Sequence, residues 1–413
     1  SVAMKILQIN NYHYLRGGSE RYFLDISAAL SAAGHDVQTF STHSDFDVMT
    51  HFRRRGSIDP VSSNNPKLSD AFKSVYNKDA AFQLECIIEQ WAPDVVHLHI
   101  YYGQLTASVI ASIRKYGIPM VQTLHEYKLV CPVHSLIKNG KYCESCAGRS
   151  FWKAAVNRCN RGSIVRSAYS AVESYVSKYL GSHSSPEIFI AVSKFQKDIL
   201  VRNGVPNEKL VILPHYSHRA EHLGGAEDYF LYVGRLAQGK GLETLLDAYS
   251  TLPIGSPKLH IVGEGDKKSA LVDYANRLGI QKSIVWQGHL SGEELHAAYS
   301  GAIAVINPSE LNETFGLTVL EAMSYGKPVI VSQYGALPEL VEHRKSGFVF
   351  KSRDELSKYL SILSSGVSIR RSMSSRNREL CSVKYSEKEH LQRLEVIYRQ
   401  AIRSSKGRMP TQH

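Results

Sequence analysis

The stretch AIAVINPSELNETFGLTVLEAMSYGKPVIVS (302–332) holds one complete strand–helix–strand unit. Its first apolar run (302–309) predicts a β-strand, the apolar spacing over 316–325 predicts a helix, and the run over 328–332 predicts the next strand. Both strand runs are apolar almost throughout, which is typical of parallel strands that helices cover on both faces. The stretch therefore predicts an α/β fold built on a parallel sheet.

The same alternation continues on both sides of this stretch. In the first half of the chain we predict strands at 4–10, 36–40, 95–100, 120–125, 188–193 and 210–214. After a polar, turn-rich stretch at 218–228 the pattern restarts, with strands at 230–235, 258–265, 283–289, 302–309 and 328–332. The predicted helices include 19–33, 241–250, 266–278, 291–300, 316–325, 336–343 and 387–403. Since 413 residues suffice for two cores, we predict two Rossmann-like, doubly wound domains.

The domain boundaries follow from where this pattern stops and restarts. We predict an N-terminal domain over 1–217, which carries an insertion over about 126–180, and a C-terminal domain over 218–385. Residues 386–413 lie beyond the second sheet, and we predict that their helix packs back on the first domain. Open α/β sheets bind ligands beside the carboxyl ends of their strands, so we expect the two domains to face a central cleft.

Composition and charge exclude several classes of protein. The chain is 43% hydrophobic and 21% charged, as folded soluble proteins are, and no apolar run reaches the roughly 20 residues of a spanning helix. No signal-peptide pattern opens the chain, so a cytoplasmic location is expected. The net charge of +11 is the one feature that suggests nucleic acid. No zinc-finger pairing, helix-turn-helix or aromatic RNA-binding signature accompanies it, so no nucleic-acid partner is expected.

The loop VGRLAQGKG (233–241) combines two cations with a helix start. Arg235 ends a predicted strand, and Lys240 lies just before the next helix, whose free N–H groups already favour an anion. The two side chains suit a diphosphate group. Two ordinary surface cations on a solvated loop would give the same pattern.

Two acidic residues lie near the start of the helix at 316–325. Glu313 is on the loop before it, and Glu321 is about two turns inside it, among apolar residues. A buried carboxylate needs a partner, and sugar hydroxyls would supply one. For Glu321, a partly exposed helix acid is an equally good interpretation.

These motifs together resemble glycosyltransferase family 4, whose members are retaining enzymes of the GT-B fold. The resemblance lies in E-x-F-G-L-x-x-x-E, from Glu313 to Glu321, and in GRL…KG, from Gly234 to Gly241. It extends to the first domain, where Gly17 and Gly18 follow the first strand and His125 follows a central strand. It covers essentially the whole chain. The insertion is similar to that of family members in bacterial surface-polysaccharide pathways.

The resemblance implies a role for each matching residue. Arg235 and Lys240 hold the diphosphate of a nucleotide-sugar donor that carries UDP or GDP. Glu313 binds hydroxyls of the transferred sugar, and His125 contacts that sugar near its anomeric carbon. Glu321 binds the ribose. The remaining donor-binding residues implied by the resemblance are Gly17 and Gly18 at the diphosphate, Phe315, Gly316 and Leu317 through their backbone amides, and Gly263, Glu264 and Gly265 near the base.

The chemistry fits these residue types. Charge builds on the departing diphosphate during glycosyl transfer, and fixed cations stabilise it, which replaces a catalytic metal. Asp45 and Asp47 have the D-x-D spacing of a metal motif, but their polar surroundings (41–51) do not suggest converging carboxylates. We therefore expect no catalytic metal. The alternative activity is a nucleotide-sugar epimerase or hydrolase of the same fold.

Four of the six cysteines lie within the insertion. Cys131, Cys143, Cys146 and Cys159 are separated by eleven, two and twelve residues, a pattern that can close a Cys₄ zinc site. Free or redox-active thiols remain open as the alternative, and His134 could replace one ligand. Cys86 and Cys381 are isolated and are predicted to be buried as small hydrophobic residues.

The basic residues are concentrated in the same insertion. Residues 128–178 hold nine Lys and Arg against two acidic residues, a local charge of +7. This segment suits a glycan or polyprenol-diphosphate-linked acceptor, and peripheral contact with the anionic inner face of the plasma membrane. An ordinary solvated helix is the alternative. The side chains concerned are Arg149, Phe151, Trp152, Lys153, Arg158, Arg161, Arg166, Tyr169 and Tyr175, to which Arg370 and Arg371 could add.

Overall fold

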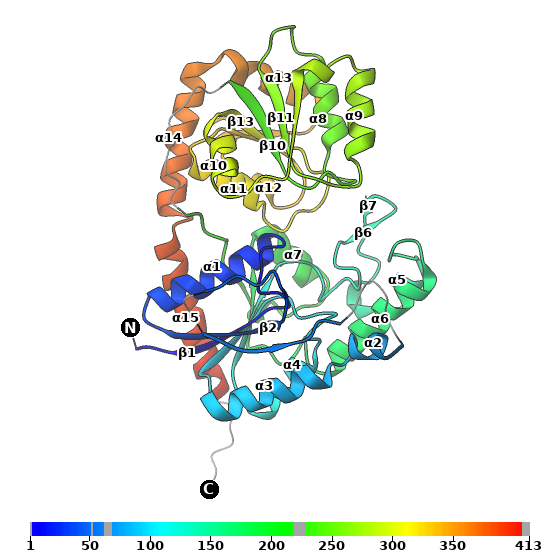
Figure 1. The fold of residues 1–413 in the computed structure, drawn as a ribbon, viewed down its shortest axis with the longest axis vertical. Coiled ribbons are helices and arrows are strands. Elements are labelled where there is room, and N and C mark those ends of the chain that lie inside the picture. The colour runs from blue at the N-terminus through cyan, green and yellow to red at the C-terminus, as the bar shows by residue number, and fades with distance from the viewer. Residues whose placement is uncertain (1, 51–52, 62–67, 219–227, 407–413) are drawn as a thin grey trace. The chain divides into compact units, whose positions relative to one another are not determined.

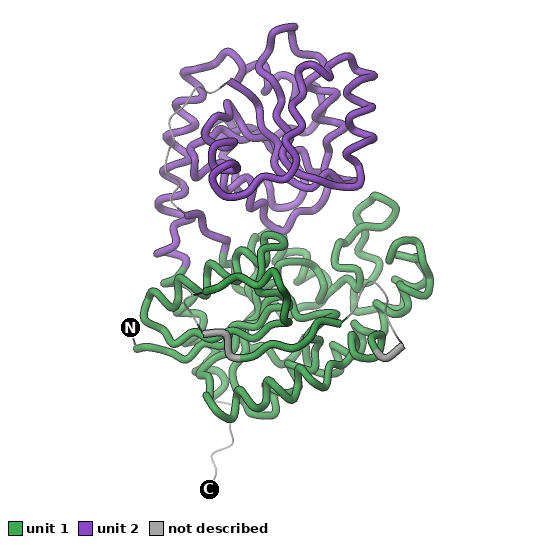
Figure 2. The backbone as a smooth tube through the Cα atoms, viewed as in Figure 1, with its two compact units in different colours: residues 1–213, 391–413 green, residues 214–390 purple. Residues whose placement is uncertain are grey.

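The chain folds into two compact α/β units (Figure 1), which Figure 2 shows in separate colours. The computed structural model describes residues 2–50, 53–61, 68–218 and 228–406. Unit 1 consists of residues 1–213 and 391–413, and unit 2 of residues 214–390. The sequence pattern places these boundaries at 217/218 and 385/386, a few residues away in each case. The prediction of two Rossmann-like domains is confirmed.

Unit 1 is built on a seven-stranded sheet in which neighbouring strands run parallel. In spatial order its strands are β3 (Arg53–Ile58), β2 (Asp36–Thr42), β1 (Lys5–Ile9), β4 (Val95–Leu98), β5 (Met120–Leu124), β8 (Ile188–Ala191) and β9 (Leu210–Ile212). This order is that of a Rossmann sheet. Ile9 pairs with Phe40 on one side and Leu98 on the other, so these strands end level with one another. The loops that follow them therefore leave the sheet at one edge.

Helices follow most of these strands. The helices of unit 1 are α1 (Gly18–Ala32), α2 (Leu68–Lys73), α3 (Lys78–Trp91), α4 (Ser108–Lys115), α5 (Lys153–Val156), α6 (Ile164–Tyr179) and α7 (Lys194–Arg202). Leu84 and Ile88 of α3 pack with Leu7 and Val96 of the sheet in one buried cluster. In the described part of the chain, no helix has both the length and the apolar character needed to cross a membrane.

Unit 2 is built on a six-stranded parallel sheet. Its strands in spatial order are β12 (Ile284–Gly288), β11 (Lys258–Val262), β10 (Tyr229–Val233), β13 (Ala302–Asn307), β14 (Val329–Ser332) and β15 (Gly347–Phe350). Its helices are α8 (Leu242–Ser250), α9 (Lys268–Arg277), α10 (Gly292–Ser300), α11 (Leu317–Ser324), α12 (Leu337–Leu340), α13 (Arg353–Ser365) and α14 (Val367–Val383). Phe230, Leu259 and Ile306 of the sheet share one buried cluster with Leu245 and Leu360 of the helices.

The last helix, α15 (Glu387–Lys406), begins in unit 2 and packs for most of its length on unit 1. Its fully buried Tyr398 is the centre of a polar network. The Tyr398 hydroxyl accepts a hydrogen bond from Gln8 Nε2 at 3.2 Å and lies 2.7 Å from His97 Nδ1. His97 Nε2 lies 2.7 Å from Thr123 Oγ1. The network therefore joins α15 to β1, β4 and β5.

Several elements were absent from the sequence prediction. The pattern predicted no element between 344 and 386, yet β15, α13 and α14 lie there. The sequence of α14, VSIRRSMSSRNRELCSV, is so polar that its apolar face reduces to Met373, Leu380 and Cys381. β3 has the sequence RRRGSI, which lacks the apolar run of a buried strand, and it lies at the edge of its sheet. Both misses arise because polar sequence carries little periodic signal.

Removing the Tyr398 hydroxyl tests the network. Tyr398→Phe leaves Gln8 Nε2 and His97 Nδ1 without this partner in a buried site, so we expect the free energy of unfolding to fall by about 1–3 kcal/mol. Urea denaturation of the variant and the wild type measures this difference. The matched control is Tyr179→Phe, since Tyr179 is 87% exposed and its loss of a hydroxyl should cost less than about 0.5 kcal/mol. Equal stability of the two variants would contradict the prediction.

Candidate active site

In unit 2, two loops that follow adjacent strands lie against each other. β10 and β13 are neighbours in the sheet, so the loops over 234–241 and 308–316 leave the same edge. The backbone N–H of Glu310 donates to the carbonyl of Gly239 at 2.8 Å. Gly241 has φ +69°, and a Cβ there would lie 1.9 Å from the carbonyl oxygen of Pro308. A glycine is needed at this position for the loops to approach so closely.

These loops bring Lys240 and Glu313 together. Lys240 Nζ lies 2.6 Å from Glu313 Oε1, and Ser309 Oγ donates to the same oxygen at 2.9 Å. The two charged side chains are 21% and 24% exposed, so both remain accessible. An ammonium has three N–H donors and a carboxylate has two oxygens, so each can bind a further polar group and keep this contact. The pair offers a cation for a phosphate beside an acceptor for hydroxyls.

Arg235 lies two residues after the end of β10, and its side chain is exposed. Its carbonyl accepts a hydrogen bond from the Tyr232 hydroxyl at 3.0 Å, which holds the backbone at this point. Burial raises the pKa of Tyr232 far above its usual value, the Glu313 carboxylate adds to this, and the Arg235 guanidinium opposes it. Arg235 and Glu313 are therefore both within electrostatic range of Tyr232.

The glycines predicted near the base have a packing role in the structure. Gly263 has φ +136°, and a Cβ there would lie 1.9 Å from the carbonyl oxygen of Gly234. A Cβ on Gly265 would lie 2.1 Å from the carbonyl oxygen of Leu236. The backbone N–H of Leu236 donates to the backbone carbonyl of Glu264. The Glu264 side chain is exposed and pairs with Lys268. These residues thus hold the loop of Arg235 in place, and their contact with a base stays a prediction.

The start of α11 presents backbone amides at the end of the second loop. Gly316 is the N-cap residue with φ +113°, and Leu317 is the first helical residue. Phe315 is buried and packs edge-on against His215 at a ring distance of 5.1 Å. The buried ring anchors the loop, which leaves the N–H groups of 315–317 at a helix N-terminus that favours an anion.

Glu321 is half-buried and has a partner that the sequence did not indicate. The Tyr299 hydroxyl donates to Glu321 Oε2 at 2.8 Å, and the Tyr299 ring stacks on Tyr325 at 5.4 Å. Tyr299 is 1% exposed, so its hydroxyl has to find a polar group inside unit 2. A tyrosine at the end of a helix is too common for sequence alone to single it out. The ribose role of Glu321 stays a prediction.

In unit 1, the loop after β1 leads into α1 through Gly17 and Gly18. Gly17 is the N-cap residue in an extended conformation, with φ −168°, which any residue can adopt. The nearest atom to a Cβ on Gly17 is Glu20 Oε2 at 3.4 Å, so the fold itself does not require glycine there. Glu20 is 5% exposed and accepts a hydrogen bond from Ser19 Oγ. Sequence reasoning missed Glu20, although an acid in the first turn after two glycines was a usable signal.

His125 follows β5 and joins the polar network of unit 1. His125 Nε2 lies 3.1 Å from His99 Nδ1, and His99 Nε2 lies 2.7 Å from Gln8 Oε1. Because Gln8 presents its oxygen, His99 carries its proton on Nε2 and accepts at Nδ1, which makes His125 Nε2 the donor. Burial lowers the pKa of His125 to about 3, so it stays a neutral donor at physiological pH. The alternation H-L-H at 97–99 signalled these histidines, and sequence reasoning did not use it.

Glu126, the next residue, has a raised pKa, whereas the pKa of His125 is lowered. Burial raises the pKa of Glu126 to about 7, Glu20 and Glu173 add to the rise, and Lys128 opposes it. Lys128 and Glu173 form a buried ion pair, and Glu126 Oε2 lies 3.4 Å from His134 Nδ1. An acid with this pKa changes charge near neutral pH, directly beside His125.

The four cysteines of the insertion line one small pocket, and all are free thiols. His134 is not part of its lining and contacts Glu126 instead. Cys381 is buried as predicted, but Cys86 is only half-buried, so the prediction for Cys86 is wrong. It lies on α3 beside Glu85, which faces Lys115 and water.

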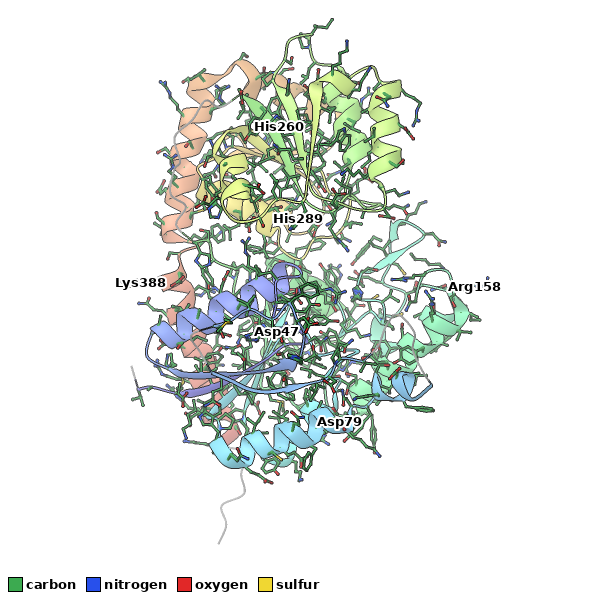
Figure 3. All side chains as sticks on the ribbon, viewed as in Figure 1. Asp47, Asp79, Arg158, His260, His289 and Lys388 are labelled. Atoms are coloured by element: carbon green, nitrogen blue, oxygen red, sulfur yellow. The ribbon has the colours of Figure 1, made fainter. Side chains whose placement is uncertain are left out.

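Other predicted positions have different surroundings. Phe151 is fully buried against Tyr175, so it is no part of a surface patch, whereas Arg158 is exposed at the outer edge of unit 1 (Figure 3). Tyr169 is half-buried and donates to the carbonyl of Ala71. Arg370 donates to the carbonyls of Leu363 and Ser364 at the end of α13, in unit 2.

Asp47 (labelled in Figure 3) has a local structural role. Its Oδ2 accepts from the backbone N–H of Ser44 at 2.9 Å and lies 3.4 Å from His43 Nδ1. These contacts close a turn within the segment.

Two family models match consecutive parts of the chain. Residues 16–215 match the model described as Glycosyltransferase Family 4, and residues 216–380 match the model described as Glycosyl transferases group 1. Together the two matches cover both units.

Known proteins resemble the chain over most of its length. The glycogen synthase of Mycobacterium tuberculosis is 29% identical over 368 residues, which are 82% of this chain and 80% of that protein. An uncharacterised 42.6 kDa protein in the cps region of Klebsiella pneumoniae is 24% identical over 356 residues, 82% of this chain and 87% of that one. The structure of Anabaena Alr3699/HepE in complex with UDP has a TM-score of 0.69 at 17% identity, over 96% of this chain and 100% of that one. A glycosyltransferase from Rickettsia africae has a TM-score of 0.70 at 17% identity, over 97% and 99%. The structural likeness confirms the expected GT-B fold.

The shifted pKa of Glu126 predicts a pH-dependent stability. In the unfolded chain Glu126 ionises near its ordinary pKa of 4.5, and in the folded chain near 7, so its burial costs stability as the pH rises from 4.5 through 7. We expect Glu126→Gln to be more stable relative to wild type at about pH 8 than at about pH 5, by about 1–3 kcal/mol. Urea denaturation at both pH values measures this difference.

The exposed Glu293→Gln, at the start of α10, is the matched control for the loss of one carboxylate. A Glu126→Gln variant whose stability relative to wild type is the same at both pH values would show that burial does not shift Glu126.

Proposed function

Because the chain belongs to glycosyltransferase family 4, we propose that it is a retaining enzyme that moves one sugar from a nucleotide-diphosphate sugar to a glycan or lipid-linked acceptor, without a catalytic metal. The observation that carries the proposal is the contact between Lys240 and Glu313 at the carboxyl ends of β10 and β13. It sets a phosphate-binding cation beside a hydroxyl-binding carboxylate, which are the two groups that a sugar diphosphate needs.

Donor binding uses the N–H donors of Lys240 and the carboxylate oxygen of Glu313 that their mutual contact does not occupy. Lys240 keeps one N–H on Glu313 and directs others to the diphosphate, together with the exposed Arg235. Glu313 accepts from hydroxyls of the sugar, and Ser309 holds its orientation. The amides at the start of α11 add donors for the same anion.

The proposed role of the two cations in the reaction follows from the charge that develops on the leaving diphosphate. As the bond from the anomeric carbon to the diphosphate breaks, negative charge grows on the leaving oxygen, and Lys240 and Arg235 stabilise it without rearranging. His125 contacts the sugar as a neutral hydrogen-bonding group, since its pKa of about 3 keeps it uncharged. His99 is a positioning residue, because its contact at 3.1 Å fixes the ring of His125.

The donor nucleotide is UDP or GDP in this proposal. A solved structure of Alr3699/HepE contains UDP and another contains UDP-glucose, which favours a uridine donor. An epimerase or hydrolase of the same fold is the competing activity, and it would turn over the donor at the same rate without an acceptor.

Substitution of the ion pair tests the donor site. We expect Lys240→Ala and Glu313→Gln each to lower the rate of sugar transfer by about 10²–10³-fold, because each removes a group that acts in the transition state. Thermal shifts with UDP and GDP measure nucleotide binding, which Lys240→Ala should weaken. Lys282→Ala, an exposed lysine of the same unit, is the control. A folded Lys240→Ala variant with wild-type transfer would contradict the site.

The acceptor side of the proposal rests on the surface of α6. This helix buries its small polar residues Ser167, Ser170, Ser174 and Ser177, with Glu173. Its exposed side is apolar, and α5 packs against the helix. The exposed apolar residues of the two helices are Trp152, Val156, Ile164, Val165, Val172, Tyr175 and Tyr179.

An apolar face with arginines beside it suits an anionic membrane. Arg158 and Arg161 are exposed in the turns between α5 and α6, and Arg166 is exposed in the first turn of α6. Each basic residue near an anionic surface contributes about 1 kcal/mol. We propose that α5 and α6 contact the inner face of the plasma membrane and receive a polyprenol-linked acceptor for surface-polysaccharide synthesis. The Klebsiella pneumoniae relative from a cps region supports this pathway.

Vesicle binding tests the membrane contact. We expect the chain to sediment with vesicles that contain anionic phosphatidylglycerol, and Arg158→Ala with Arg161→Ala to weaken this binding by about 10-fold or more. Val165→Ser with Tyr179→Ser should weaken it as well, whereas Ile254→Ser, on the exposed surface of unit 2, should not. Equal binding to neutral and anionic vesicles, or none, would contradict the proposal.

A further inference from the structure

The four cysteines of the insertion surround one pocket, although they come from different turns. Cys131 lies in the turns that follow β5, and Cys143 follows the hairpin of β6 (Ile137–Lys138) and β7 (Lys141–Tyr142). Cys146 precedes a 3₁₀ turn (Ala147–Arg149), and Cys159 lies in the turns after α5. All four line the same small pocket, so they are near neighbours.

The backbone around these cysteines has little regular structure to hold it. Its elements are two strands of two residues, a 3₁₀ turn of three and a helix of four. In the described part of the chain nine residues other than glycine have positive φ, and six of them lie between 134 and 161. Such conformations cost about 1–2 kcal/mol each, so the segment needs an additional source of stability. A cross-link at the pocket would supply it.

A hydrogen bond at one of the sulfurs suits a thiolate. The N–H of Ser145 donates to Cys143 Sγ at 3.4 Å, across the C-x-x-C turn. Backbone N–H groups aimed at a sulfur stabilise its negative charge, the form in which cysteine binds metals.

Three lysines lie within electrostatic range of the cysteines, outside the pocket lining. Each of three lysines interacts electrostatically with one of the cysteines. These pairs are Lys128 with Cys131, Lys138 with Cys159, and Lys153 with Cys146. Four thiolates around a divalent ion carry a net charge of −2, which Lys138 and Lys153 offset, since Lys128 is already paired with Glu173.

We propose that Cys131, Cys143, Cys146 and Cys159 bind one structural Zn²⁺ ion. Four sulfur ligands in tetrahedral arrangement are the coordination of structural zinc, and they leave no position for a substrate. Binding converts four thiols and one aqueous Zn²⁺ ion into a tetrathiolate complex and releases four protons to water.

The thiols must close on the ion for this complex to form. No three His, Cys, Asp or Glu side chains in the described ranges are already arranged as a metal site. The sulfurs line the pocket wall, and rotation about χ1 moves a sulfur between staggered positions. The rest of the wall includes Val133, Leu136 and Ile137, which exclude water from the ion.

The ion would hold the segment that follows His125. Cys131 donates its backbone N–H to the carbonyl of Tyr127 at 2.8 Å, so its position is tied to the turn that carries Glu126 and Lys128. The zinc site thereby stabilises the insertion where it begins, after β5. It does not depend on the proposed transfer reaction.

Metal analysis of the purified full-length chain tests the proposal. We expect about one zinc per chain after dialysis, and loss of most of it in Cys143→Ser and in Cys146→Ser. Cys86→Ser, which changes a half-buried cysteine outside the pocket, is the matched control and should keep its zinc. Exchange with Co²⁺ should give the visible absorption of tetrahedral cobalt bound to thiolates.

The wild-type protein alone can overturn the proposal, even if a serine variant does not fold. Iron instead of zinc in the purified protein would show that the site binds a different metal. A measured mass that corresponds to two disulfides would show that covalent cross-links, and not an ion, join the cysteines. Wild-type protein from zinc-supplemented cells that contains neither metal, with all four thiols free to react in the folded state, would exclude a metal site.

Discussion

Parallel pairing fixes where every candidate site residue of this chain can lie. In a parallel sheet all strands end at the same edge, so the loops after neighbouring strands meet there whatever their separation in sequence. Lys240 and Glu313 are 73 positions apart and touch because β10 and β13 are adjacent. Gly241 allows these two loops to approach closely, because a Cβ there would overlap the carbonyl oxygen of Pro308. Gly263 likewise allows the end of β11 to approach the loop of Arg235. Strand order and Gly241 thus bring the two charges together.

The polar network of unit 1 follows from the same geometry but has a different consequence. His97 lies on β4 and His99 just beyond it, where a buried sheet leaves imidazoles no water to bind. Each finds a partner inside the protein, and the chain of contacts ends at Tyr398 of α15. Burial keeps His125 uncharged, and its contact with His99 fixes the direction of its ring. The helix that closes unit 1 therefore also orients a candidate site residue.

Much of this fold was predictable from the sequence, because buried strands are continuous apolar runs and the helices between them have regular spacing. The predicted positions of Lys240, Glu313 and Gly316 at strand ends required no more than that. The partner of Gln8 could not be predicted in this way, since Tyr398 lies 390 positions away and no local pattern links them. Polar elements such as α14 were missed because their few buried residues leave no periodic signal.

The insertion differs from the two sheets in which side chains its main helix buries. α6 buries serines and Glu173 and exposes valines and tyrosines, so the hydrophobic effect does not hold it against unit 1 in the usual way. Its attachment rests on hydrogen bonds and on the buried ion pair of Glu173 with Lys128, which contribute less than apolar burial. Elsewhere in the insertion apolar side chains such as Leu136 and Phe151 are buried, so the polar contact face belongs to α6 alone. The exposed apolar face of α6 and the four cysteines both lie in this segment and outside the two sheets, and the proposed membrane contact and the proposed zinc site rest on them.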